Sequence, residues 1–161
     1  MKDGYYVIDA HVHTYKTKEI GLQAQAGNGF AGLGGTPDEL LGLMDKYGIN
    51  QAVQVNMTPA RSMFEAAKHG LEPGAGEEAI EAIREKITGR VKRRNEWTCG
   101  LAMENESLIP FPSVDPLMGT EAMVAEVEDK AENFGAKGIK IHPTEGNFYP
   151  DDDSLWPVYE T

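Results

Sequence analysis

Short apolar segments alternate along the chain with longer segments whose apolar residues recur at helical spacing. Residues 5–13 are short, apolar and rich in β-forming side chains, which predicts a first strand. Residues 36–47 predict a helix. Thr36 is a good N-cap, Pro37 suits the first helical position, and Gly48 follows as a stop. The later segments repeat the alternation: strands are predicted at 51–56, 108–114 and 136–142, and helices at 60–70, 77–104, 120–135 and from residue 151 onward.

Strands that are separated by helices imply parallel crossover connections, so the pattern predicts an α/β sheet or barrel. Pro110 and Pro112 weaken the third strand, because proline cannot donate a ladder hydrogen bond. The last predicted helix carries an apolar stripe with nothing in the sequence to cover it, and the chain stops at Thr161 after barely two turns. We therefore expect residues 1–161 to be one partial domain whose C-terminal half lies elsewhere.

Composition narrows the classes of partner. The net charge is −11, which argues against a nucleic acid or an anionic membrane, since phosphate surfaces are bound by clustered Lys and Arg. The one basic run, residues 90–94, falls inside a predicted helix, and we interpret it as a solvated helix face. The single cysteine, Cys99, excludes an internal disulfide and favours a reducing compartment. With no secretory leader pattern and no long apolar span, we expect a cytoplasmic protein that binds a small molecule.

The strongest chemical signal is the pair His11 and His13 at the end of the first predicted strand. Residues two apart in a strand point to the same side, so both imidazoles project together from its C-terminal end. This is the end at which barrel enzymes build their sites. Imidazole nitrogens are good ligands for zinc, and the pair would supply half of a four-coordinate site. The sequence therefore predicts a metal centre here.

Other polar residues share the geometry of this pair. Asp9 has the same parity as the histidines and is expected to orient an imidazole N–H, or else to bond the backbone. Lys140 and His142 share one face at the end of the fourth predicted strand. They are predicted to be catalytic or to bind an anionic substrate. The alternative for Lys140 is an ammonium group that reaches solvent.

The loop after the first strand contains Gly27-Asn28-Gly29-Phe30-Ala31-Gly32, which matches a dinucleotide-binding pattern. It does not directly follow the strand or open a helix, so we interpret it as a loop over the site. Tyr15, in the same connection, is predicted to touch substrate. Asn56, which ends the second predicted strand, is assigned to the same role.

Five segments resemble the amidohydrolase superfamily, in particular the branch that includes aminocarboxymuconate-semialdehyde decarboxylase. They are IDAHVHT (8–14), TPDELLGLMDKYGINQAVQVN (36–56), IPFPSVDP (109–116), GAKGIKIHP (135–143) and DDSLWPVYE (152–160). The resemblance implies a (β/α)₈ barrel of the TIM type with one divalent metal, usually zinc. It assigns His11 and His13 as ligands and expects a further His after strand five and an Asp after strand eight. A full barrel takes about 250 residues, so the chain would hold about four βα units, the front half.

The resemblance implies a hydrolase that acts on a C–N or C–O bond of a small, carboxylate-bearing molecule through metal-activated water. A decarboxylase using the same site is the first alternative. A phosphoesterase of the polymerase-and-histidinol-phosphatase type also opens with D-x-H-x-H-T, but its expected second histidine motif does not follow. A non-catalytic alternative is a half-barrel that self-associates into a homo-oligomer through its open strand edges.

Overall fold

The computed structural model describes residues 4–25 and 32–161, and its centre is a parallel sheet. The three strands are β1 (Ile8–Val12), β2 (Gln51–Gln54) and β3 (Leu108–Pro110), in the order β1-β2-β3. Ala52 of β2 lies opposite Asp9 on one side and Leu108 on the other. The predicted α/β class, parallel connections and first three strands are therefore confirmed.

The fourth predicted strand is reduced to a single parallel bridge between Ser113 and Lys140. The Lys140 amide donates to Pro112 O at 2.8 Å, and the Val114 amide donates to Lys140 O at 3.0 Å. The segment therefore runs beside the chain that follows β3, as predicted, but the ladder is short. Pro110 and Pro112 have no N–H group to offer, which ends regular pairing at that point.

The helices follow the predicted boundaries closely. α2 (Pro37–Tyr47) begins at the predicted N-cap, where the Glu39 amide donates to Thr36 Oγ1 at 3.4 Å as part of a capping box. The predicted stop, Gly48, ends the helix at φ 69°. α1 (Lys18–Ala24) was not predicted, and it begins at Thr17. The other helices are α3 (Ala60–His69), α4 (Glu77–Glu104), α5 (Thr120–Phe134), α6 (Pro143–Gly146) and α7 (Trp156–Glu160), with short 3₁₀ turns at Pro116–Met118 and Asp153–Leu155.

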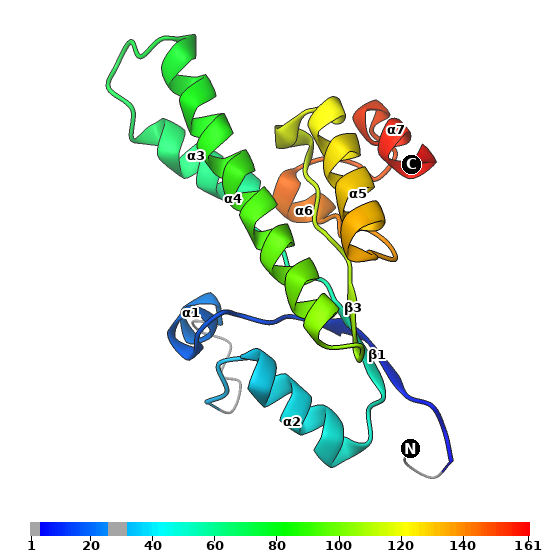
Figure 1. The fold of residues 1–161 in the computed structure, drawn as a ribbon. Helices are drawn as coiled ribbons and strands as arrows, with labels where there is room; N and C mark the ends of the chain where they lie inside the picture. Colours follow the sequence, from blue (N-terminus) through cyan, green and yellow to red (C-terminus); the bar gives the residue numbers. More distant parts are fainter. Residues whose placement is uncertain (1–3, 26–31) are drawn as a thin grey trace.

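α4 connects two parts of the core. Its 28 residues span ~42 Å at 1.5 Å per residue, and Figure 1 shows α3 along its first turns with α5, α6 and α7 gathered on one side. Val91 packs in a cluster with Phe64 of α3 and Met123 of α5. Ala102, further along α4, packs in a second cluster beneath the sheet with Ala52. No helix among the described residues is long and apolar enough to cross a membrane.

The apolar stripe at the end of the chain is half covered. Leu155 and Val158 are buried in the cluster with α5, whereas Trp156 and Tyr159 stay exposed and meet edge to face at 6.0 Å. The expectation that the whole stripe lacks a partner is therefore wrong for its inner residues. A tilt of one short helix against α5 is enough to bury one side of it.

Cys99 provides a test of the packing of α4. Its side chain is fully buried, and burial raises the pKa of its thiol to about 12. The thiolate is the form that attacks Ellman's reagent, so the native protein is expected to stay unlabelled and to react fully in denaturant. The colour yield per chain, with and without guanidinium, measures this. Rapid native labelling would contradict the placement of α4.

Candidate active site

The two predicted ligands meet at the carboxyl end of β1. His11 lies within the strand and His13 just after it, and both side chains are exposed. Their Nε2 atoms are 3.1 Å apart. Two nitrogen ligands ~2.1 Å from one metal are separated by roughly 3.0–3.4 Å for bond angles between octahedral and tetrahedral. The distance between the two nitrogens therefore fits ligation of one shared divalent metal. Among the described residues, no third His, Cys, Asp or Glu joins them.

The electrostatic surroundings favour the neutral, metal-binding form of His13. His13 keeps an exposed edge, but partial burial of its ring, followed by the nearby His11, Lys140, Arg94 and His142, lowers its pKa from 6.5 to about 4. The imidazole is therefore uncharged at pH 7, and a ring nitrogen keeps its lone pair. The structure thus brings Lys140 and His142 to the same end of the sheet as the histidine pair.

Lys140 and His142 hold different positions at this end. Lys140 is half-buried at the bridge to Ser113. His142 is the N-cap of α6, and its Nδ1 accepts the Glu145 amide at 3.2 Å. In the neutral ring this bond leaves the proton on Nε2. Both residues line a small pocket with Asp115, whose pKa is raised chiefly by burial. Sequence analysis did not single out Asp115.

Asp9 contacts the main chain rather than a ring. Its Oδ1 accepts the His11 amide at 3.0 Å, which is the backbone role named as the alternative above. This bond fixes the strand at the first ligand. A contact between Asp9 and an imidazole stays a prediction.

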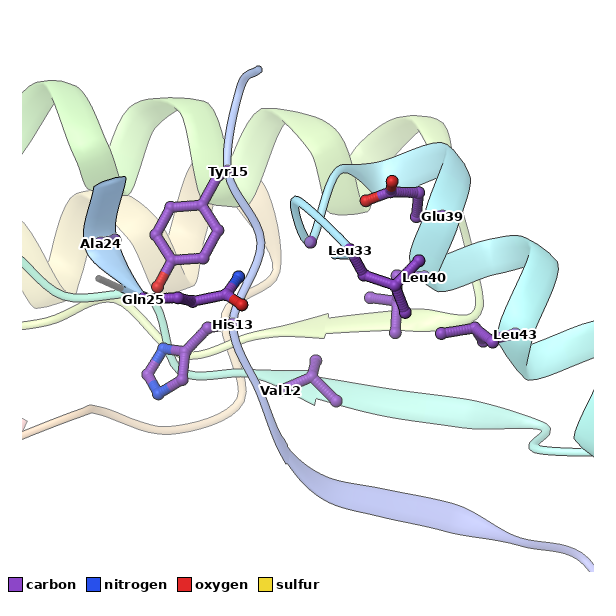
Figure 2. A pocket seen from close by; sticks show the side chains of 10 residues that line it. Val12, His13, Tyr15, Ala24, Gln25, Leu33, Glu39, Leu40 and Leu43 are labelled. Atoms are coloured by element: carbon purple, nitrogen blue, oxygen red, sulfur yellow. The ribbon is translucent and has the colours of Figure 1, made fainter. Parts of the chain in front are cut away.

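Tyr15 lines a cavity beside His13. The cavity holds about 460 Å³ between the end of β1, α1 and α2, and its walls are mostly apolar. Figure 2 shows His13, Tyr15 and Gln25 at one end and Leu33, Leu40 and Leu43 at the other. A ligand there would meet an imidazole at one end and aliphatic side chains at the other. The predicted loop motif at residues 27–32 lies outside the described residues except for Gly32.

A buried polar network, which sequence analysis missed, fixes the chain after His13. Asn56 accepts the Thr14 amide at 2.7 Å and donates its own Nδ2 to Thr14 Oγ1 at 2.8 Å and Thr98 Oγ1 at 3.0 Å. Gln54 Nε2 donates to the same Thr14 hydroxyl at 2.9 Å. These four side chains are at most 1% exposed. Asn56 therefore connects β1, β2 and α4 in this structure, and its predicted contact with substrate stays a prediction.

The family model described as Amidohydrolase matches residues 8–161, which include every residue placed above. The chain belongs to the amidohydrolase family. The resemblance stated from sequence is thereby confirmed. No curated protein sequence matches this amidohydrolase chain significantly.

Solved structures share the fold. 5-Carboxyvanillate decarboxylase from Novosphingobium aromaticivorans, with bound manganese and 3-methoxy-4-hydroxy-5-nitrobenzoic acid, superposes with a TM-score of 0.63 at 18% identity, over 99% of this chain and 48% of that one. 2,6-Dihydroxybenzoate decarboxylase bound to 2,6-dihydroxybenzoate gives 0.61 at 18% identity, over 96% and 46%. Dihydroxybenzoic acid decarboxylase from a Polaromonas species, with manganese and 2-nitroresorcinol, gives 0.60 at 17% identity, over 96% and 45%.

The chain spans about half the length of these solved relatives. With its parallel strands and connecting helices, it corresponds to part of a TIM-type barrel, as the amidohydrolase resemblance predicted. Identities below one fifth establish the shared fold and not a shared substrate.

The network around Asn56 yields a stability prediction. Asn56→Ala removes the partners of the Thr14 amide and hydroxyl in a fully buried position, so unfolding free energy is expected to fall by about 1–3 kcal/mol. Asn133→Ala is the matched control, because that amide is exposed and bonds only Asp129. It is expected to change stability by less than about 0.5 kcal/mol. Urea unfolding monitored by circular dichroism measures both, and equal losses would contradict the network's role.

Proposed function

We propose that the protein is a metal-dependent enzyme that removes carbon dioxide from a small aromatic carboxylate. The observation that carries the proposal is the pair of Nε2 atoms 3.1 Å apart beside the cationic Lys140 and Arg94. The solved relatives support the choice of reaction, since those described above are decarboxylases crystallised with benzoate or resorcinol derivatives. The apolar cavity next to His13 suits the aromatic ring of such a substrate.

His11 and His13 would hold a divalent metal, which supplies Lewis-acid polarisation of a bound oxygen when present. Sequence analysis expected zinc. Manganese is the metal in two of the related structures, so we place it first. Imidazole nitrogens bind either ion. Two imidazoles whose coordination sphere is completed by other ligands therefore do not distinguish zinc from manganese.

Side chains of this protein are assigned the remaining roles, which are substrate binding and orientation. Lys140 binds the substrate carboxylate as a point charge. His142 donates a hydrogen bond from its Nε2–H to a substrate oxygen, because Nδ1 is occupied as the acceptor of the Glu145 amide. As carbon dioxide leaves, the electron pair of the broken C–C bond stays on the ring carbon and takes up a proton from solvent, which forms the new C–H bond. Tyr15 forms one wall around the ring.

Hydrolysis of a C–N or C–O bond at the same site is the second candidate, and the family description favours it. The two reactions differ in product: decarboxylation releases carbon dioxide, whereas hydrolysis of an amide, ester or lactone releases a new carboxylic acid. The family match argues against the phosphoesterase alternative. Self-association stays a prediction.

Metal content tests the ligand pair directly. His11→Ala and His13→Ala are each expected to reduce bound manganese or zinc from about one per chain to near zero, because replacing one imidazole ligand by water causes a large loss of affinity. His69→Ala is the control, since that exposed histidine ends α3 far from the pair in sequence. Mass spectrometry of the metals after dialysis measures occupancy. Equal metal in all variants would exclude this pair as the site.

Product analysis tests the reaction. The metal-loaded protein is expected to release carbon dioxide from 2,6-dihydroxybenzoate or 5-carboxyvanillate, and His142→Ala, which removes the Nε2–H donor, is expected to lower kcat/KM by about tenfold with metal content unchanged. Chromatography of the aromatic product gives the rate. Release of acid from amide or lactone substrates, with no decarboxylation, would favour the second candidate instead.

A further inference from the structure

A second hollow lies at the same end of the sheet as the histidine pair. It holds about 510 Å³ between the segment after β1, the segment after β2, α1 and α4. Tyr15 and Ala24 line both this hollow and the cavity beside His13, so the two adjoin. We call the second hollow the basic groove, after four of its lining residues: Lys16, Arg90, Arg93 and Arg94.

The charge of the basic groove is unlike that of the rest of the chain. Acidic residues outnumber basic ones by 26 to 15 overall, yet among the residues that the structure describes, none of those that line the groove is acidic. Within the described part of the chain, none of the four cations takes part in an ion pair. Arg90 lies three and four residues from Arg93 and Arg94, and like charges at these spacings destabilise a helix. A merely solvated helix face, as sequence analysis interpreted residues 90–94, would not need this concentration of charge.

Arg94 is held in place rather than solvated. Its Nη2 donates to Thr14 O, and its guanidinium lies 5.2 Å from the ring centre of Tyr15 and 4.9 Å from that of Trp97. Its Nε is buried without a partner among the described residues. Burial is the first cause that lowers the pKa of Arg94, and Arg90 adds to it. Such a fixed cation is prepared to bind an anion without further loss of side-chain freedom.

The other walls of the basic groove are largely apolar, with Ile20, Met57 and Pro59 among them. A ligand with an apolar body and an anionic group would match both kinds of surface. We propose that the basic groove binds aromatic carboxylates and passes them to the cavity at His13. The choice of carboxylate rests on the proposed function, whereas the binding of an anion rests on the groove alone. Local cations would also offset the repulsion that a net charge of −11 exerts on an anionic substrate.

Direct binding tests the proposal. Isophthalate, an aromatic dicarboxylate, is titrated by calorimetry into the protein after removal of metal. Arg90→Gln/Arg93→Gln is expected to weaken its affinity by about tenfold, and added NaCl is expected to weaken wild-type binding. The matched control is Lys86→Gln/Lys92→Gln, which removes the same charge from exposed positions of α4 outside the basic groove and is expected to leave affinity unchanged. Both altered arginines are exposed, and near-ultraviolet circular dichroism checks that each variant folds.

The outcomes separate this inference from the proposed function. The proposal for the basic groove is overturned if wild type does not bind isophthalate. It is also overturned if both double variants weaken the affinity for isophthalate equally. Selective weakening in Arg90→Gln/Arg93→Gln supports it even if no carboxylate is decarboxylated, in which case the proposed function alone fails. If decarboxylation does occur, the arginine variant is expected to lower kcat/KM by about the same factor at unchanged kcat, because binding rather than chemistry is affected.

Discussion

The arrangement of the candidate active site depends on one set of buried hydrogen bonds, those of Thr14, Asn56 and Thr98. They join the chain after β1, the chain after β2 and the C-terminal third of α4, and these side chains are at most 1% exposed. A buried amide without partners costs free energy, so each member of the set requires the others. Because Thr14 directly follows His13, the network fixes where the second imidazole leaves the sheet.

The same network couples the histidine pair to the basic groove. Thr98 donates to Arg94 O at 2.9 Å, and Arg94 in turn donates to Thr14 O. The guanidinium is therefore anchored at the segment that carries His13, and its charge is one of the causes of the low pKa of that imidazole. A neutral His13 for a cation and fixed positive groups for an anion are thus produced by one arrangement. An imidazole that binds metal must be uncharged and a carboxylate needs a cation, so neighbouring side chains must differ in charge.

Local rules predicted the secondary elements well where the signal lies within a few residues. The cap at Thr36 and the stop at Gly48 concern contacts three to five positions apart, and both formed as expected. α1 was not predicted because its apolar residues Ile20 and Leu22 are two positions apart and form no stripe at helical spacing, and both stay exposed. The fourth strand was predicted too long because the length of a strand depends on the backbone hydrogen-bonding groups of the adjacent segment. That neighbour carries two prolines.

The sequence by itself determined that His11 and His13 share one side of a strand end, since parity in a strand is a property of adjacent residues. Only the tertiary structure decided what surrounds them. Asn56 meets Thr98 across 42 positions and Arg94 meets Thr14 across 80, and no periodicity connects residues so far apart. The role of Asn56 and the basic groove depend on how α4 packs across the sheet. The physical reason is that burial and charge are summed over elements that only the folded chain brings together.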